Sequence, residues 1–151
     1  MPTNHFWGNF QDAYRLRDLQ GDARPEVVSA DGRIERISSV YYSADPIQIW
    51  SYDHGRFRDV TRRYPARVAQ DARRWWALYV TERRSKRRWV REPLAAWVAD
   101  EYLLRHSLLA DRVVAAALRR GELDPPATEH AASARRWVEE LKAFLRSAGY
   151  A

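Results

Sequence analysis

The chain has 151 residues, 46% hydrophobic and 13% aromatic, which is enough for one domain with a buried core and too apolar for a disordered protein. It contains no cysteine, which excludes disulfides, zinc–thiolate sites and thiol nucleophiles. The formal net charge is +6, and lysine supplies only two of the 26 basic residues, at positions 86 and 142. Arginine suits phosphate binding, but the interspersed acidic residues favour a compositional origin for its excess.

Residues 1–61 have the closely spaced turn-forming residues that are typical of a small β structure. The turn-forming stretches GDARP, ADGR, SADP and DHGR separate segments 26–29, 33–42, 47–52 and 56–61, which are rich in β-branched and aromatic residues. The stretch Asp53–Gly55 fits a short hairpin connection in which Gly55 adopts a positive φ. The sequence therefore predicts an antiparallel meander of three to four strands.

Residues 62–151 change to a helical period. Apolar residues at positions 68, 72, 75, 76 and 79 form one stripe, and Pro65 stands where a first helical turn tolerates proline. This pattern predicts a helix from Pro65 to Arg84. Because Trp75, Trp97 and Trp137 each fall on an apolar stripe, we expect them to pack between helices.

Three further helices are expected. They begin near Pro93, near Leu109 and at Ala134, and Gly121 and Gly149 are placed to end the last two. The stripe of the third helix comprises Leu109, Val113, Ala116 and Ala117. The predicted fold class is thus α+β: a β meander over residues 1–61 followed by antiparallel helical hairpins over residues 62–151, packed as one unit.

The stretch from residue 18 to residue 26, DLQGDARPE, has the spacing of a calcium loop. Oxygen ligands at alternating positions would come from Asp18, Gln20, Asp22, the backbone carbonyl of Arg24, and Glu26. A hard cation such as Ca²⁺ requires several oxygens, two or three of them from carboxylates. The spacing predicts Ca²⁺ as the candidate cofactor.

The segments YRLRDLQGDARPEVV and DPIQIWSYDHGRFRDVT, which lie within residues 14–61, resemble the repeat unit of FG-GAP or integrin-like (VCBS-type) domains. The resemblance implies a calcium-stabilised β unit in an extracytoplasmic bacterial protein, with Asp18, Asp22 and Glu26 as ligands. Gln20 replaces an Asp of the family pattern, and Ala23 replaces a Gly at a position expected to need positive φ. Both changes weaken the site. The alternative is a loop held without metal by Asx-type turns at Asp18 and Asp22.

The most basic stretch of the chain is residues 82–92, with six basic residues around Trp89. Arginines neutralise phosphates and an exposed Trp stacks on bases, so this stretch predicts a nucleic-acid surface. The candidate residues are Arg73, Arg74, Trp76, Arg83, Arg84, Lys86, Arg87, Arg88, Trp89 and Arg91. The alternative is a solvated connection between two helices, with basic residues placed favourably at a helix C-terminus.

Catalytic motifs are absent from the sequence: the four histidines are isolated, and neither a nucleophile elbow nor a phosphate-cradling glycine loop is present. We therefore predict a non-enzymatic structural or protein-interaction module, with an arginine-rich nucleic-acid-binding protein as the alternative. No signal-like leader and no run approaching 18 apolar residues is present. The chain as written thus points to the cytoplasm, whereas the resemblance points outside it.

Overall fold

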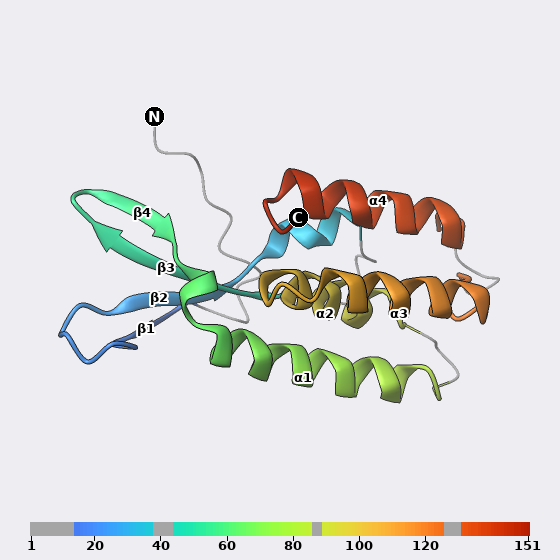
Figure 1. Ribbon diagram of the computed structural model, residues 1–151, viewed down its shortest axis with the longest axis horizontal. Helices are drawn as coiled ribbons and strands as arrows, with labels where there is room; N and C mark the ends of the chain where they lie inside the picture. The colour runs from blue at the N-terminus through green and yellow to red at the C-terminus, as the bar shows by residue number, and fades with distance from the viewer. Residues whose placement is uncertain (1–13, 38–43, 86–88, 126–130) are drawn as a thin grey trace.

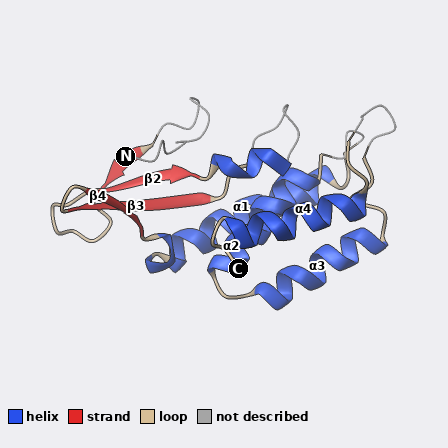
Figure 2. Ribbon diagram, turned by 90° about the horizontal axis from the view of Figure 1, so that it is seen from above, coloured by secondary structure: helices blue, strands red, loops and turns tan. Residues whose placement is uncertain are grey.

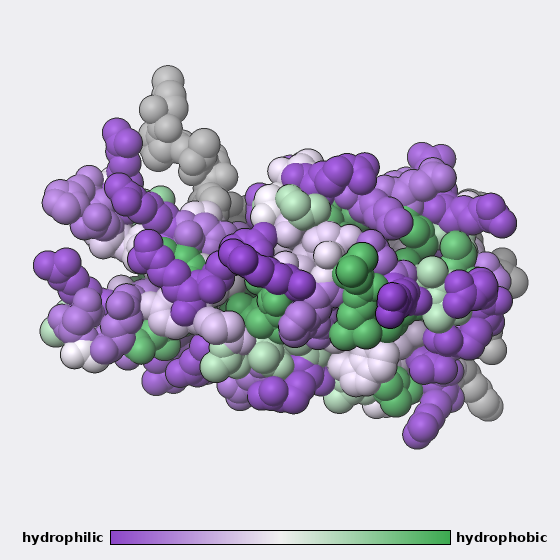
Figure 3. All heavy atoms as spheres, in the orientation of Figure 1, coloured by the Kyte–Doolittle hydropathy of each residue, from purple (hydrophilic) through white to green (hydrophobic). Residues whose placement is uncertain are grey.

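The computed structural model describes residues 14–37, 44–85, 89–125 and 131–151, and the fold within them is α+β, as predicted. Four antiparallel strands form one sheet in the order β1-β2-β3-β4. Their bounds are Arg15–Arg17 (β1), Glu26–Ala30 (β2), Ile47–Asp53 (β3) and Arg56–Asp59 (β4). The sheet projects from one end of the helical layer (Figure 1). Hydrophilic side chains predominate over this projecting end (Figure 3).

The helical layer contains four long helices among the described residues. Their bounds are Pro65–Glu82 (α1), Arg91–Leu103 (α2), Ser107–Arg119 (α3) and Ala134–Ser147 (α4), and two short 3-10 helices cover Gly32–Ile37 (η1) and Thr61–Arg63 (η2). Helix α2 packs against both α1 and α3, and α4 packs against α3 and η1 (Figures 1 and 2). None of the described helices is long and apolar enough to cross a bilayer.

The β3–β4 hairpin forms as predicted. Asp53 pairs with Arg56 across the turn, and the two residues between them have φ of 48° (His54) and 78° (Gly55). Two successive positive φ values characterise the turn that matches strand twist in two-residue hairpins. The prediction of a positive φ at Gly55 is confirmed.

The predicted strand over residues 33–42 is wrong where the structure describes it. Residues 32–37 form the 3-10 helix η1, and residues 38–43 lie outside the described part. The carboxylate of Asp31 accepts the backbone N–H of Arg33, and the Asp31 carbonyl accepts that of Ile34. This turn directs Ile34, only 1% exposed, into the core of the helices. Local turn chemistry and burial override the β propensity of this segment.

The apolar stripe predicted for the third helix is displaced by one residue. Helix α3 buries Ala110, Val114 and Ala117, whereas Leu109 is 51% exposed. The chain enters α3 through Arg105, whose φ is 65°. This left-handed residue ends α2 and sets the angle at which α3 begins. The first helix ends at Glu82, two residues before the predicted end.

The core lies among the helices, and α2 is at its centre. Ten of the 13 residues of α2 are buried, including Glu92, Asp100 and Glu101. The tryptophans predicted to pack between helices are buried: Trp75, Trp97 and Trp137 are 3%, 5% and 2% exposed. Small residues on α2, which contains three alanines, allow its neighbours to approach closely on all sides.

Candidate anion-binding groove

A groove of about 540 Å³ runs between the sheet and helix α1. Four arginines line it: Arg15 and Arg17 from β1, and Arg67 and Arg74 from α1. Its only acidic lining residue is Asp71. We call this feature the basic groove.

The positions of the four arginines follow from strand and helix periodicity. Arg15 and Arg17 are two residues apart on a strand, so they share a face of the sheet while Leu16 points to the other face. Arg67 and Arg74 are seven residues apart on α1, so they stack two turns apart on one side of the helix. Strand and helix thus present guanidinium groups to the same space.

Most of this positive charge has no partner within the protein. No hydrogen bond or ion pair joins the side chain of Arg15, Arg17 or Arg67 to another residue in the described part of the chain. Only Arg74 is paired: its Nη1 lies 3.6 Å from Asp71 Oδ1, and its guanidinium lies 4.3 Å from the Trp75 ring centroid. The groove therefore offers three uncompensated cations to a ligand.

Asp71, on the floor of the groove, connects α1 to the sheet. Its Oδ2 accepts the backbone N–H of Ile47 and the indole N–H of Trp75, both at 2.9 Å. Burial raises the pKa of Asp71 despite these hydrogen bonds and the nearby Arg74. This carboxyl therefore positions β3 and α1 more than it neutralises the groove.

Behind Asp71 lies Asp100 of α2, which is fully buried. No N–H or O–H group of the described residues donates to either carboxyl oxygen of Asp100. Burial, together with the adjacent Asp71 carboxyl, raises the pKa of Asp100 to about 10. Asp100 thus holds its proton at neutral pH, and burial raises the pKa of Asp71 beside it as well. The pair carries one negative charge rather than two.

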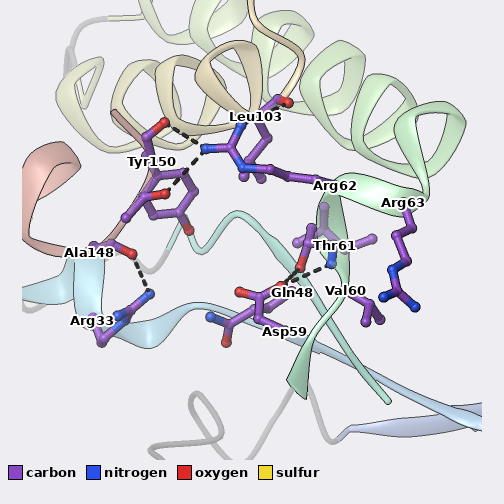
Figure 4. Close-up of a pocket in the computed structure, with 12 residues that line it drawn as sticks. Arg33, Gln48, Asp59, Val60, Thr61, Arg62, Arg63, Leu103, Ala148 and Tyr150 are labelled. Atoms are coloured by element: carbon purple, nitrogen blue, oxygen red, sulfur yellow. Dashed lines mark hydrogen bonds between the residues drawn. The ribbon is translucent and has the colours of Figure 1, made fainter. Parts of the chain in front are cut away.

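A second hollow, of about 400 Å³, lies where the sheet meets the C-terminal residues (Figure 4). Arg62 donates to the backbone carbonyls of Tyr102, Leu103, Gly149 and Tyr150 at 2.9–3.4 Å. Arg33 donates to the Ala148 carbonyl and forms a two-point contact with the Asp31 carboxylate. Because these guanidinium groups already bind the chain itself, this pocket holds the end of α4 on the sheet and is a weaker ligand site than the basic groove.

The calcium-type loop is closed by its own hydrogen bonds. The carboxylate of Asp18 accepts the backbone N–H groups of Gly21, Asp22 and Ala23, which lower its pKa, and Asp22 accepts that of Arg24. Ala23 has φ of 63°, the positive value expected where the family pattern has Gly. These contacts are the Asx-type turns of the metal-free alternative.

Glu26, the last candidate ligand, has both carboxylate oxygens engaged by donors of the protein. It accepts the Leu19 N–H, the Gln20 amide and the Tyr64 hydroxyl at 2.8–3.0 Å. Burial raises the pKa of Glu26, but these hydrogen bonds outweigh it and leave the pKa lowered. Nowhere in the described ranges do three His, Cys, Asp or Glu side chains gather as metal ligands. The calcium site stays a prediction, and the arrangement of the described side chains does not fit a bound ion.

We expect calcium in millimolar excess to raise the melting temperature by less than about 1 °C relative to chelator, because the loop's carboxylates already have donors. A site filled at one hundred times its dissociation constant would add about 2.7 kcal/mol, or roughly 5 to 10 °C for a chain of this size. Differential scanning fluorimetry makes the comparison, with Asp18→Ala as the control. A shift of several degrees in the wild type that Asp18→Ala removes would restore the calcium interpretation.

The residues of the predicted nucleic-acid surface do not form one surface. Arg74 lines the basic groove, and Arg73 and Arg84 are exposed on or just beyond α1. Lys86, Arg87 and Arg88 lie outside the described residues. The candidate set is therefore divided around α1.

The remaining candidates have structural partners. Arg83 pairs with Glu122 at 2.9 Å, and Arg91 donates to the carbonyls of Leu123 and Ala132. Trp76, 36% exposed, packs against Trp97 and Tyr79, and Trp89 is half-buried. Neither tryptophan lines the groove. The sequence did not identify Arg15, Arg17 and Arg67, because the alternation in Arg15–Arg17 is too short to predict a strand.

No protein-family model, curated protein or solved structure matches this chain. The likeness of residues 14–61 to the FG-GAP unit therefore stays a prediction, and the function has to be argued from the groove.

Proposed function

We propose that this protein is a non-enzymatic binding module that holds an anionic, phosphate-bearing polymer such as a nucleic-acid strand in the basic groove. The observation that carries the proposal is the set of three groove arginines, Arg15, Arg17 and Arg67, that have no partner among the described residues. The sequence predicts an interaction module, with a nucleic-acid-binding protein as the alternative. This proposal combines the two: an interaction module whose partner is a polyanion.

Guanidinium groups in a shared hollow repel one another, and a bound anion removes that repulsion. Arginine binds phosphate oxygens through two parallel N–H donors, so each unpaired guanidinium is a complete site for one phosphate. Two arginines on β1 and two on α1 face the groove from separate walls. A ligand with several phosphates along its length can therefore engage both walls at once.

We expect a labelled single-stranded oligonucleotide to bind with an affinity that falls steeply with salt, because each phosphate contact releases counterions. For three contacts the slope of log K against log salt is about −2. The double variant Arg15→Glu/Arg17→Glu should bind at least about tenfold more weakly and with a shallower slope. Fluorescence anisotropy at several salt concentrations measures both quantities.

The matched control is Arg135→Glu/Lys142→Glu, which makes the same change in net charge on the exposed face of α4. The side chains of these residues form no hydrogen bond or ion pair with any other described residue. If the control variant loses as much affinity as Arg15→Glu/Arg17→Glu, binding reflects overall charge and the groove is not the site. Absence of binding by the wild type at low salt would end the proposal.

A further inference from the structure

We infer that the binding surface continues from the basic groove along the solvent face of α1, and that its ligand is a flexible single phosphodiester chain recognised through its phosphates alone. This inference rests on the proposed function and specifies the ligand of the same site. It follows from the charge pattern of α1, the hollow at its far end and the absence of aromatic side chains along the path.

One line of residues runs the length of α1 on its exposed side. Positions spaced alternately by three and four lie one above another on a helix, and here they are Arg67, Gln70, Arg74, Ala77 and Thr81, with Arg84 in the turn after the helix. All six are exposed, as is Arg73 beside them. We call these seven residues the α1 stripe.

The α1 stripe contains four arginines and no acid. The two acidic residues of α1 lie elsewhere: Asp71 is held in the floor of the groove, and Glu82 accepts the hydroxyl of Ser85. Arg67, Arg73 and Arg84 have no partner in the part of the chain that is described. A solvated helix face usually carries charges of both signs. The α1 stripe carries positive charges only, so it is complementary to an anion.

Another basic hollow, distinct from the two described above, lies at the C-terminal end of the α1 stripe. Three arginines, Arg83, Arg84 and Arg120, line a space of about 300 Å³ at the C-terminal end of α1. Glu122 accepts from Arg83 at 2.9 Å and from Arg120 at 2.6 Å and so neutralises part of this charge, while Arg84 is left without such a pair. Cationic hollows therefore lie at both ends of the stripe.

The distance along the stripe identifies the ligand as a polymer. From Arg67 to Thr81 the helix rises about 21 Å, and single-stranded nucleic-acid sites commonly cover about 4 to 16 nucleotides. The path leaves a groove between two walls and then follows an exposed helix (Figure 1). A flexible chain can follow such a path, whereas duplex DNA is stiff over about 150 base pairs.

Recognition through phosphates alone follows from the lack of a stacking platform. Base stacking requires exposed aromatic rings, and neither the stripe nor the lining of the groove contains one. Trp76, three residues after Arg73 on α1, packs against Trp97 with ring centroids 4.8 Å apart. The surface should therefore bind a phosphate chain without preference for base sequence.

The test measures the affinity of oligothymidylates from about 4 to about 12 nucleotides for the wild type, Arg73→Glu/Arg84→Glu and Arg15→Glu/Arg17→Glu. We expect wild-type affinity to rise with length, and Arg73→Glu/Arg84→Glu to remove most of that rise while leaving the shortest oligomer nearly unaffected. Oligoadenylates and inorganic polyphosphate of equal charge should compete within about threefold, and a duplex of the same length should bind at least about tenfold more weakly.

The outcomes separate this inference from the proposed function. If Arg15→Glu/Arg17→Glu loses binding but Arg73→Glu/Arg84→Glu matches the Arg135→Glu/Lys142→Glu control at every length, the groove binds and the stripe does not. Tighter binding of duplex, or a strong preference between bases, would also overturn the inference. If neither groove nor stripe variants change binding, the proposed function itself fails. Circular dichroism of each variant confirms that these exposed substitutions leave the fold intact.

Discussion

Asp100→Asn is expected to raise the free energy of unfolding by about 4 kcal/mol at pH 7. Asp100 is fully buried, its oxygens receive no donor from the described residues, and its pKa is raised from 3.8 to about 10. In the folded protein it is protonated at pH 7, whereas in the unfolded chain it is ionised, so folding must add a proton. An Asn side chain is neutral in both states and retains an N–H donor for Asp71, which removes that cost.

The sign of the pH dependence follows from the direction of the pKa shift. Because the folded pKa lies above the unfolded one, the contribution of Asp100 to stability is fully present below pH 4 and is lost as pH rises towards 10. The advantage of Asp100→Asn should therefore be about 2 kcal/mol at pH 5 and grow to about 4 kcal/mol at pH 7. Urea unfolding at about pH 5, 6, 7 and 8 measures the trend. Each step of one pH unit should change the advantage of Asp100→Asn by about 1.4 kcal/mol.

The control for this prediction is Glu139→Gln, which makes the same chemical change on the exposed side of α4. Its effect should be within about 0.5 kcal/mol and independent of pH. A gain for Asp100→Asn that did not change with pH would show that the side chain is not protonated in the fold. A loss of stability would show that the buried Asp71–Asp100 pair needs the acid itself.

Asp100 illustrates what the sequence could not reveal. The spacing of apolar residues in the second helix predicts one buried face, on which Asp100 does not lie, and a carboxylate is ordinarily exposed. In the structure α2 is surrounded, so the polar side of the helix is buried as well. The burial of that side depends on where α1 and the sheet pack, which no local pattern in α2 records.

The parts of the fold that could be predicted are those fixed locally. Helical period, capping and backbone conformation account for three of these parts. They are the regular stripe of α4 with its end at Gly149, the proline at the start of α1, and the turn at Gly55. Segment 33–37 was predicted wrongly because its β-branched residues suggested a strand, while the Asp31 turn and the burial of Ile34 against the helices decided otherwise.

The candidate site was likewise only partly predictable from the sequence. Clusters of arginine around residues 73–91 are visible in the sequence, but the arginines of the basic groove come from segments 50 residues apart, since Arg17 and Arg67 line one space only when the sheet packs on α1 through β3. A three-residue strand such as β1 offers little periodicity to detect. The groove was therefore accessible only once the sheet order and the position of α1 were known.

Trp137→Ala should lower the free energy of unfolding by about 3 to 5 kcal/mol, as large aromatic deletions in cores do. Trp137 is 2% exposed, its indole N–H donates to the Ile37 carbonyl at 2.9 Å, and the Arg91 guanidinium lies 5.6 Å from its ring centroid. The side chain thus joins α4 to η1 and to the start of α2. With a total stability of about 5 to 15 kcal/mol expected, the melting temperature should fall by about 10 °C or more.

Two companion variants separate packing from hydrogen bonding. Trp137→Phe keeps most of the ring in the core and loses only the bond to Ile37, so its cost should be about 1 to 2 kcal/mol. Trp76→Ala removes a tryptophan that is 36% exposed, and its cost should be less than half that of Trp137→Ala. Because η1 connects directly to β2, loss of the Trp137 contact should also loosen the sheet on the helices. If Trp137→Ala and Trp76→Ala prove equally mild in thermal unfolding, the Trp137 contact does not stabilise the junction, and the other contacts, those of Asp71 and of Arg33 and Arg62, hold the sheet on the helices.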